Sequence, residues 1–248
     1  MITGIQISSL APLMKDAEGF ETCVKNLTHM GFRHTQLQWI DPSVKADEIG
    51  FILRKYGMKS LGTQEKYDQL IARFDDFIKI NHNAGSKEVC FSTIPDRYFE
   101  EKTLYDFIDE MKENMKILEK ENLYASFHPT FKDFRNHSGK YACDILFESI
   151  PELMIVPDTN QLIRAGVDVK IWLKKHKDRI RMIHFKDMIY QGGIMKLVPA
   201  GKGITDFKSI IPILKDIGNE YILAEQETWE GDPFERIKES FDFIETIK

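Results

Sequence analysis

Four short apolar stretches in the second half of the chain each end in a side chain that can bind a divalent metal ion. These side chains are His128, Asp158, His184 and Glu225. Two imidazoles and two carboxylates suit a hard or borderline ion such as Mn²⁺, Mg²⁺ or Zn²⁺. If the four stretches are parallel strands of a closed barrel, their carboxyl-terminal ends meet at one mouth. The pattern therefore predicts the metal centre of an enzyme.

Each of these residues also has a plainer interpretation. His184 could be a structural histidine satisfied by hydrogen bonds, and Asp158 could be the N-cap of a helix. His128 could be a metal ligand, a general acid or base, or a histidine bonded to a neighbour. Glu225 and Glu227 lie on one face of their strand, so one could bind the metal while the other contacts a substrate. Burying both carboxylates without a compensating cation would be costly, which favours the metal.

The elements that must position these residues alternate along the chain. Short apolar runs, typical of parallel strands covered by helices, are followed by longer amphipathic segments. Eight such units in 248 residues average about 31 residues each, the size expected for a (β/α)₈ TIM barrel. A doubly wound open sheet is the alternative, but no Gly-x-Gly-x-x-Gly follows the first strand. We therefore predict a single α/β domain that spans residues 1–248.

One long irregular connection, Met188–Asp206, follows the seventh strand. Because loops after barrel strands line the active mouth, we expect it to be a wall or lid of the site, with a plain surface excursion as the alternative. Asp187 is expected to fix this loop. The expected strands are Gly4–Ser8, Thr35–Trp39, Lys59–Gly62, Glu88–Ser92, Leu123–His128, Met154–Asp158, Arg181–Phe185 and Tyr221–Gln226, and the expected helices include Tyr67–Asn81, Glu101–Glu121, Phe207–Ile217 and Pro233–Ile247.

The composition argues against several classes of protein. A net charge of −5 and a pI near 5.9 give no support for a nucleic-acid surface, which would be basic. No apolar run reaches the roughly 20 residues of a membrane span, and the first residues lack the features of a signal peptide. Cys23, Cys90 and Cys143 are few, odd in number and widely spaced, which argues for a reducing compartment. We expect a cytoplasmic protein that binds neither nucleic acid nor a membrane.

Two stretches around the seventh strand resemble a family signature. Residues 184–187 read His-Phe-Lys-Asp, and residues 201–207 read Gly-Lys-Gly-Ile-Thr-Asp-Phe. Together they resemble the His-x-Lys-Asp … Gly-x-Gly-x-x-Asp-[Phe/Trp] signature of the xylose isomerase-like TIM barrels. That family comprises sugar phosphate isomerases and epimerases, with related dehydratases and ketose 3-epimerases. Residues 127–134, 158–166 and 224–227 are similar to further stretches of the family, and the likeness runs from the first strand to the last helix.

The resemblance implies a divalent metal held by one residue from each of strands five to eight. Asp158, His184 and Glu225 match the family's ligand positions. Many members carry a glutamate on strand five that binds metal and removes a proton, whereas this chain has no carboxylate there until Asp133. We assign His128 as the ligand in its place. The usual pair of epimerase glutamates is not available, so a weak or lost metal is the alternative.

The expected function is that of a metal-dependent isomerase or epimerase, which acts on a small sugar, polyol or keto-sugar through an enediolate. Glu225 or Glu227 would be the base, with His128 as its candidate partner. Lys186 would stabilise the enediolate or hold a substrate oxygen, with a salt bridge to an acid as the alternative. The alternative functions are a dehydratase of the same family, of inosose or dehydroshikimate type, and a catalytically degenerate sugar-binding barrel. Metal-dependent DNA-repair endonucleases of this superfamily need a basic groove, which this acidic chain lacks.

Three further side chains near strand ends are expected to contact the substrate. Gln38 and Trp39 end the second strand, and Gln64 follows the third. The amides could bond hydroxyl groups, and Trp39 could stack on a sugar ring. Ordinary packing or a place on the loop surface is the alternative for Trp39 and Gln64. The expected partner is a small carbohydrate-like substrate, and the sequence indicates no oligomeric state.

Overall fold

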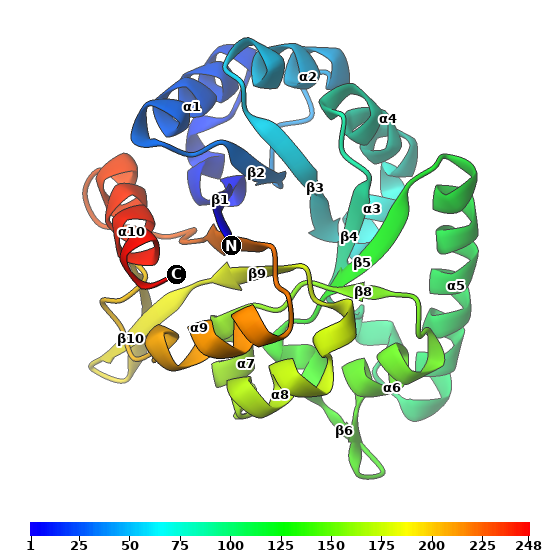
Figure 1. Ribbon diagram of the computed structural model, residues 1–248. Helices are drawn as coiled ribbons and strands as arrows, with labels where there is room; N and C mark the ends of the chain where they lie inside the picture. The colour runs from blue at the N-terminus through cyan, green and yellow to red at the C-terminus, as the bar shows by residue number, and fades with distance from the viewer.

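Eight parallel strands form a nearly closed barrel in a computed structural model of residues 1–248. All neighbours in the sheet are parallel, in the order β8-β5-β4-β3-β2-β1-β12-β9, and helices surround the sheet (Figure 1). The two edges meet through isolated bridges between Ile155 and Ile180 and between Asp158 and His184. The predicted TIM-barrel fold is confirmed.

The barrel strands are short, and their side chains alternate between the barrel interior and the helices outside. In the interior, Cys90, Val156, Met182 and Leu223 form a small apolar layer below the mouth. The outward-facing residues join a core of 57 buried apolar residues that the helices cover. The barrel strands are β1 (Ile2–Gln6), β2 (His34–Leu37), β3 (Lys59–Lys66), β4 (Glu88–Ser92), β5 (Tyr124–His128), β8 (Met154–Ile155), β9 (Met182–Phe185) and β12 (Tyr221–Ala224).

The helices have the local signals that begin and end helices. Asp16 and Asp232 cap the first and last α-helices by accepting backbone N–H groups, and Gly31 ends the first in a left-handed conformation with φ of 110°. The last helix packs beside β1, so the chain ends near its start (Figure 1). The helices are α1 (Ala17–Met30), α2 (Ala46–Lys55), α3 (Tyr67–Ala72), α4 (Phe74–Ala84), α5 (Glu101–Lys120), α6 (Ala142–Ser149), α7 (Thr159–Arg164), α8 (Val169–Lys175), α9 (Phe207–Asp216) and α10 (Pro233–Ile247), with short 3₁₀ turns η1 (Ile7–Leu13), η2 (Asp96–Tyr98), η3 (Phe131–Phe134) and η4 (Lys177–Arg179).

Two predicted elements differ from the structure near the third strand. The helix predicted at Tyr67–Asn81 is two helices, because Arg73 leaves the helical region with φ of −132° and separates α3 from α4. Gln64, predicted just past the strand, lies inside β3, which continues to Lys66 through its pairing with β4. Hydrophobic periodicity signals neither difference, and the continuation of β3 depends on its pairing with β4.

The connection Met188–Asp206, predicted to be irregular, contains a β-hairpin. Strands β10 (Asp187–Gln191) and β11 (Ile194–Val198) pair antiparallel, with Gly192 and Gly193 at the turn. Both glycines have positive φ, 59° and 79°, as a two-residue hairpin turn that matches the strand twist requires. A second small hairpin, β6 (Asn136–His137) and β7 (Lys140–Tyr141), follows β5. None of the helices combines the length and the apolar character that a membrane span requires.

Candidate active site

The four predicted metal ligands come together at the carboxyl-terminal end of the barrel. His128 ends β5, Asp158 follows β8, His184 lies in β9 and Glu225 follows β12. One ligand atom each from His128, Asp158 and His184 lies within 4.8 Å of the others, and all three residues are buried. Nδ1 of His184 is 2.9 Å from Oε2 of Glu225. We call these four residues the ligand cluster.

Hydrogen bonds outside the cluster orient the two imidazoles. Nδ1 of His128 donates to the carbonyl oxygen of Val156 at 3.0 Å, which leaves the lone pair on Nε2. Nε2 of His184 lies 2.8 Å from Oε1 of Gln36, and this same oxygen accepts from Nε2 of Gln6. Because Gln36 Oε1 can only accept, His184 carries its proton on Nε2 and keeps the lone pair on Nδ1. Histidines that bind metals are typically held in this way through their other ring nitrogen.

Both imidazoles are neutral in this environment. Burial and, secondly, the neighbouring ring of His184, with its centroid 4.9 Å away, together lower the pKa of His128 to about 3. Burial also lowers the pKa of His184 to about 3, with the charge of Lys186 as the next contribution. A metal ligand must be unprotonated, so these shifts prepare both rings for a cation.

Asp158 combines the two roles that the sequence left open. Its Oδ1 caps helix α7 by accepting from the backbone N–H groups of Asn160 at 2.7 Å and Gln161 at 3.1 Å. Its Oδ2 has no hydrogen-bond partner and lies 3.7 Å from Nζ of Lys186. Burial raises the pKa of Asp158 to about 7, against the lowering effect of Lys186. One oxygen therefore anchors the helix while the other remains free for a ligand.

Lys186 lies among three carboxylates. Its Nζ is 3.5 Å from Oε1 of Glu225, forms a direct ion pair with Oε1 of Glu227, and faces Asp158. Burial by itself would lower the pKa of Lys186, but the three carboxylates raise it above its ordinary value. Burial also raises the pKa of Glu227, and the charge of Glu225 adds to the shift. The salt bridge that was the alternative interpretation of Lys186 is present, and the predicted role toward a substrate oxygen stays a prediction.

The residues of the cluster fit a divalent cation. Asp158 Oδ2, His184 Nδ1 and Glu225 Oε2 are buried acceptor atoms without a hydrogen-bond partner. Although Nδ1 of His184 and Oε2 of Glu225 are 2.9 Å apart, no hydrogen bond joins them, because the proton of His184 is on Nε2. A ring lone pair and a carboxylate oxygen repel one another unless a cation lies beside both. Nitrogen and oxygen donors of this kind suit Zn²⁺ or Mn²⁺.

Four glutamines line the side of the barrel formed by β1, β2 and β3. Gln38 and Gln64 were predicted, and Nε2 of Gln64 donates to Oε1 of Gln38 at 3.5 Å. Gln6 and Gln36 were not predicted as site residues, although Gln36 shares its strand face with Gln38 by alternation. Gln6 Oε1, Gln36 Nε2 and Gln64 Oε1 are buried without partners. These amide atoms are available to bond hydroxyl groups.

Trp39 lies just past the end of β2, and its side chain is hydrogen-bonded to the neighbouring strand β3. Its indole N–H donates to Oε1 of Glu65 at 3.2 Å, and the side chain is 38% exposed. Its backbone is in the left-handed region with φ of 56°, which a bulky residue rarely adopts. Stacking of Trp39 on a sugar ring stays a prediction.

The hydrogen bonds of Asp187 explain why the family signature combines this aspartate with the two glycines, Gly201 and Gly203. Its carboxylate accepts from the backbone N–H groups of Gly201 at 3.0 Å, Gly203 at 2.8 Å, Thr205 at 3.1 Å and Met188 at 2.9 Å. A Cβ atom on Gly203 would lie 2.3 Å from Oδ1 of Asp187, so only glycine allows this approach. The prediction that Asp187 fixes the loop is confirmed.

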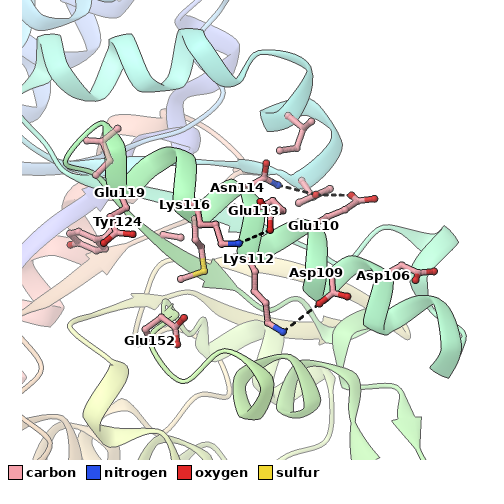
Figure 2. A pocket seen from close by; sticks show the side chains of 15 residues that line it. Asp106, Asp109, Glu110, Lys112, Glu113, Asn114, Lys116, Glu119, Tyr124 and Glu152 are labelled. Atoms are coloured by element: carbon pink, nitrogen blue, oxygen red, sulfur yellow. Dashed lines mark hydrogen bonds and ion pairs between the residues drawn. The ribbon is translucent and has the colours of Figure 1, made fainter.

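Another cavity of the molecule lies away from the cluster. It has a volume of about 1230 Å³ and runs along α5, where Lys112 pairs with Asp109 and Lys116 with Glu113 (Figure 2). None of the predicted site residues lines it. Acidic side chains and lysines spaced three residues apart are the usual solvated face of an amphipathic helix.

Comparison with known proteins agrees with this geometry. The family description "Xylose isomerase-like TIM barrel" matches residues 14–247. No curated protein sequence matches the chain. A sugar phosphate isomerase/epimerase from Parabacteroides distasonis ATCC 8503 has a TM-score of 0.80 at 15% identity, with coverage of 100% of this chain and 99% of the other.

Two further solved structures have the same fold and contain a bound group. The IOLI protein with a binding zinc atom has a TM-score of 0.78 at 13% identity, with coverage of 100% of this chain and 98% of that one. A D-allulose 3-epimerase from Methylomonas sp. in complex with D-allulose has a TM-score of 0.74 at 13% identity, with coverage of 100% and 97%. At these identities the likeness establishes the shared barrel.

Proposed function

The chain belongs to the xylose isomerase-like TIM barrel family, and from that premise we propose that it is a divalent-metal-dependent isomerase or epimerase of a small sugar, polyol or keto-sugar. The observation that carries this proposal has two parts. His128, Asp158 and His184 offer buried ligand atoms within 4.8 Å of one another, and Oε2 of Glu225 lies 2.9 Å from Nδ1 of His184. Three acceptor atoms of this cluster, Asp158 Oδ2, His184 Nδ1 and Glu225 Oε2, have no hydrogen-bond partner. Buried polar atoms are otherwise almost always hydrogen-bonded, so a bound cation would account for all three. The zinc in the related IOLI structure is in accord with this assignment.

His128, Asp158, His184 and Glu225 would hold the metal. Two carboxylates and two neutral imidazoles supply two negative charges, which balance a divalent ion. When bound, the ion would supply Lewis-acid polarisation of a substrate carbonyl. The glutamine amides on the side formed by β1, β2 and β3 would hold the hydroxyl groups of the substrate, in accord with the D-allulose bound in the similar 3-epimerase structure.

Glu227 is the best candidate for the base that removes the proton next to the carbonyl. Its Oε1 is paired with Lys186, while its buried Oε2 has no partner. Burial and the charge of Glu225 raise its pKa, which brings a carboxylate closer to the working range of a general base. The carbon-bound proton would move to Oε2 of Glu227 and return to the neighbouring carbon, while the hydroxyl proton would pass to the former carbonyl oxygen. Lys186 would face the negative charge that develops on the substrate oxygen.

The strand-five position decides between isomerisation and two-base epimerisation. A two-base mechanism needs a second base on the opposite side of the substrate, and His128 occupies the place where a glutamate would be expected. In the proposed site His128 is a metal ligand, because its free nitrogen belongs to the ligand cluster. A single free carboxylate, Glu227, then favours isomerisation.

Metal binding is the first test of this function. Mn²⁺, Mg²⁺ and Zn²⁺ are titrated into the wild type, into His184→Ala and into His82→Ala, whose imidazole is exposed and remote. One metal per chain in the wild type and in His82→Ala, but not in His184→Ala, supports the proposal and is followed by a ketose and inosose screen. Absence of binding at millimolar metal would instead indicate a sugar-binding barrel without catalysis.

A further inference from the structure

A series of side-chain hydroxyl groups runs from the buried carboxylate of Asp133 to the mouth of the barrel. Oγ1 of Thr130 donates to Oδ2 of Asp133 at 2.9 Å, and Oγ1 of Thr93 donates to Oγ1 of Thr130 at 3.5 Å. The hydroxyl oxygen of Ser92 lies 3.3 Å from that of Thr93. We call Ser92, Thr93 and Thr130 the hydroxyl chain. Because a hydroxyl group both donates and accepts, each of the three can pass a proton on.

The inner end of the hydroxyl chain lies beside the ligand cluster. Ser92 is the last residue of β4, and it pairs with His128, the last residue of β5. Side chains alternate along β4, so Ser92 faces the barrel interior like Cys90, which belongs to the apolar layer below the mouth. Ser92 is buried, and its hydroxyl is bonded to that of Thr93 alone. A lone pair of this hydroxyl is therefore free on the side of the mouth.

Asp133 also holds the backbone that positions the hydroxyl chain. Its Oδ1 accepts from the backbone N–H of Ile94 at 2.9 Å, and its Oδ2 accepts from the backbone N–H of Thr130 at 2.7 Å. Between these anchors, Thr93 has φ of 64°, a strained conformation for a β-branched residue. Such strain persists only where surrounding contacts impose it, and it is concentrated at functional sites. The strained turn places the hydroxyl of Thr93 between those of Ser92 and Thr130.

The surroundings of Asp133 suit a group that exchanges a proton near neutral pH. Burial raises its pKa to about 7, although the hydrogen bonds from Thr130 and Ile94 act in the opposite direction. Two titratable groups face it, Lys132 of the same 3₁₀ turn and Cys143 of helix α6. The charge of Lys132 also lowers the pKa of Asp133. The thiol of Cys143 stays neutral, because burial raises its own pKa well above the ordinary value.

A purely structural role accounts for only part of this arrangement. Thr130 and Asp133 form a capping box at the start of the 3₁₀ turn, which explains the bonds of Asp133 to Thr130. The capping box does not require the continuation through Thr93 to Ser92. Asp133 is also the first carboxylate after β5, the strand on which His128 replaces the expected glutamate. Both of its oxygens are bonded to the loops after β4 and β5, so it reaches the mouth through the hydroxyl chain.

We propose that Asp133 and the hydroxyl chain form a proton relay for the substrate oxygens at the ligand cluster. The inference rests on the proposed function, in which the carbon-bound proton moves through Glu227 and the hydroxyl proton passes to the former carbonyl oxygen. The substrate hydroxyl gives its proton to Ser92, and each hydroxyl group passes one proton on until Oδ2 of Asp133 is protonated. The same path in reverse delivers a proton to the former carbonyl oxygen. Each hydroxyl group gains one proton and loses one, so the protein is unchanged at the end.

The first test is a ¹³C NMR titration of the aspartate carboxyl groups in the metal-free protein. We expect Asp133 to titrate near pH 7 in the wild type. In Thr93→Val we expect a further rise of its pKa, because Thr130 donates more weakly once its own donor is lost. Thr28→Val is the matched control, since the hydroxyl of Thr28 bonds only a carbonyl of its own helix. Titration of Asp133 near its ordinary value of about 4, or equal values in Thr93→Val and the wild type, overturns the proposal.

The second test measures turnover of D-allulose and of the other ketoses and inososes of the screen with Mn²⁺. We expect kcat to fall about 100-fold in Thr93→Val with little change in KM, because acid–base transfer contributes at least about this factor. Thr93→Ser keeps the hydroxyl and should restore kcat, while Thr28→Val should match the wild type. Equal kcat values of Thr93→Val and the wild type would overturn the relay and leave the proposed function intact. A wild type that binds no metal and converts no sugar would contradict the proposed function and the relay with it.

Discussion

Nδ1 of His184 and Oε2 of Glu225 lie 2.9 Å apart in the buried mouth of the barrel, and no hydrogen bond joins them. The reason is on the other side of the ring, where Gln36 accepts the single proton of a neutral imidazole. Two acceptor atoms in this position are mutually repulsive until a cation lies beside them. Substitutions that change this pair of atoms therefore test metal binding directly.

Glu225→Gln should separate stability from metal binding. The new amide can donate to Nδ1 of His184, which replaces a repulsive contact by a hydrogen bond. The substitution also removes a carboxylate 3.5 Å from Nζ of Lys186, so in chelator we expect the free energy of unfolding to stay within about 1 kcal/mol of the wild type. The rise in Tm on addition of Mn²⁺ should disappear. Urea unfolding and thermal melts with and without Mn²⁺ measure both effects, with the exposed Glu230→Gln as control. A marked loss of stability in chelator would contradict this account of the pair.

Gln36→Leu should weaken metal binding without touching a ligand. Oε1 of Gln36 accepts from Nε2 of His184, and without it the proton of the imidazole is free to move to Nδ1. Loss of such a supporting bond typically lowers metal affinity about 10- to 100-fold. Gln38→Leu is the matched control, since Gln38 is bonded to Gln64 and not to His184. Equal Mn²⁺ affinities of the two variants would show that Gln36 does not orient the histidine.

Asp187→Ala should be among the more destabilising substitutions of a charged residue. It leaves the backbone N–H groups of Gly201, Gly203 and Thr205 without their acceptor. We expect a loss of about 2–4 kcal/mol in the free energy of unfolding, because unsatisfied buried donors each cost about 1–3 kcal/mol and water recovers part of this. Asp178→Ala, at an exposed position, should change stability by less than about 0.5 kcal/mol. Chemical denaturation compares the two variants. Equally small losses in the free energy of unfolding would refute the role of Asp187 in holding the loop.

Acidification should destabilise the metal-free protein in part through His128. Burial lowers its folded-state pKa to about 3, whereas the unfolded value is about 6.5. The folded state thus resists protonation, so this contribution to stability is complete above pH 6.5 and is lost progressively as the pH falls toward 3. Each pH unit below 6.5 costs about 1.4 kcal/mol for a fully shifted imidazole. Urea unfolding in chelator measures the free energy of unfolding at pH 7 and at pH 5.5. We expect this free energy to fall less between the two pH values for His128→Gln than for the wild type. Equal falls would refute the lowered pKa of His128.

Local sequence was sufficient for much of the fold. Strand β4 at Glu88–Ser92 and helix α10 at Pro233–Ile247 agree with the predicted bounds, because a continuous apolar run marks the strand and a capping Asp232 followed by proline marks the helix start. The break at Arg73 was missed, and so was the continuation of β3 through Gln64, which the pairing of β3 with β4 determines. Hairpin β10–β11 was missed despite Gly192-Gly193, a recognised turn signal.

The sequence by itself determined which side chains stand at the strand ends, because alternation along a strand and the order of the strands are local properties of the chain. It did not reveal that Gln36 bonds His184, 148 residues away, or that Asp158 divides its two oxygens between a helix and the cluster. Nor did it connect Asp133 to Ser92 through the hydroxyl groups of Thr130 and Thr93. Those relationships exist only after the barrel closes, since closure places residues from distant strands on one rim. The hydrogen bond to Gln36 keeps the proton of His184 on Nε2, and the lone pair on Nδ1 is therefore a consequence of barrel closure.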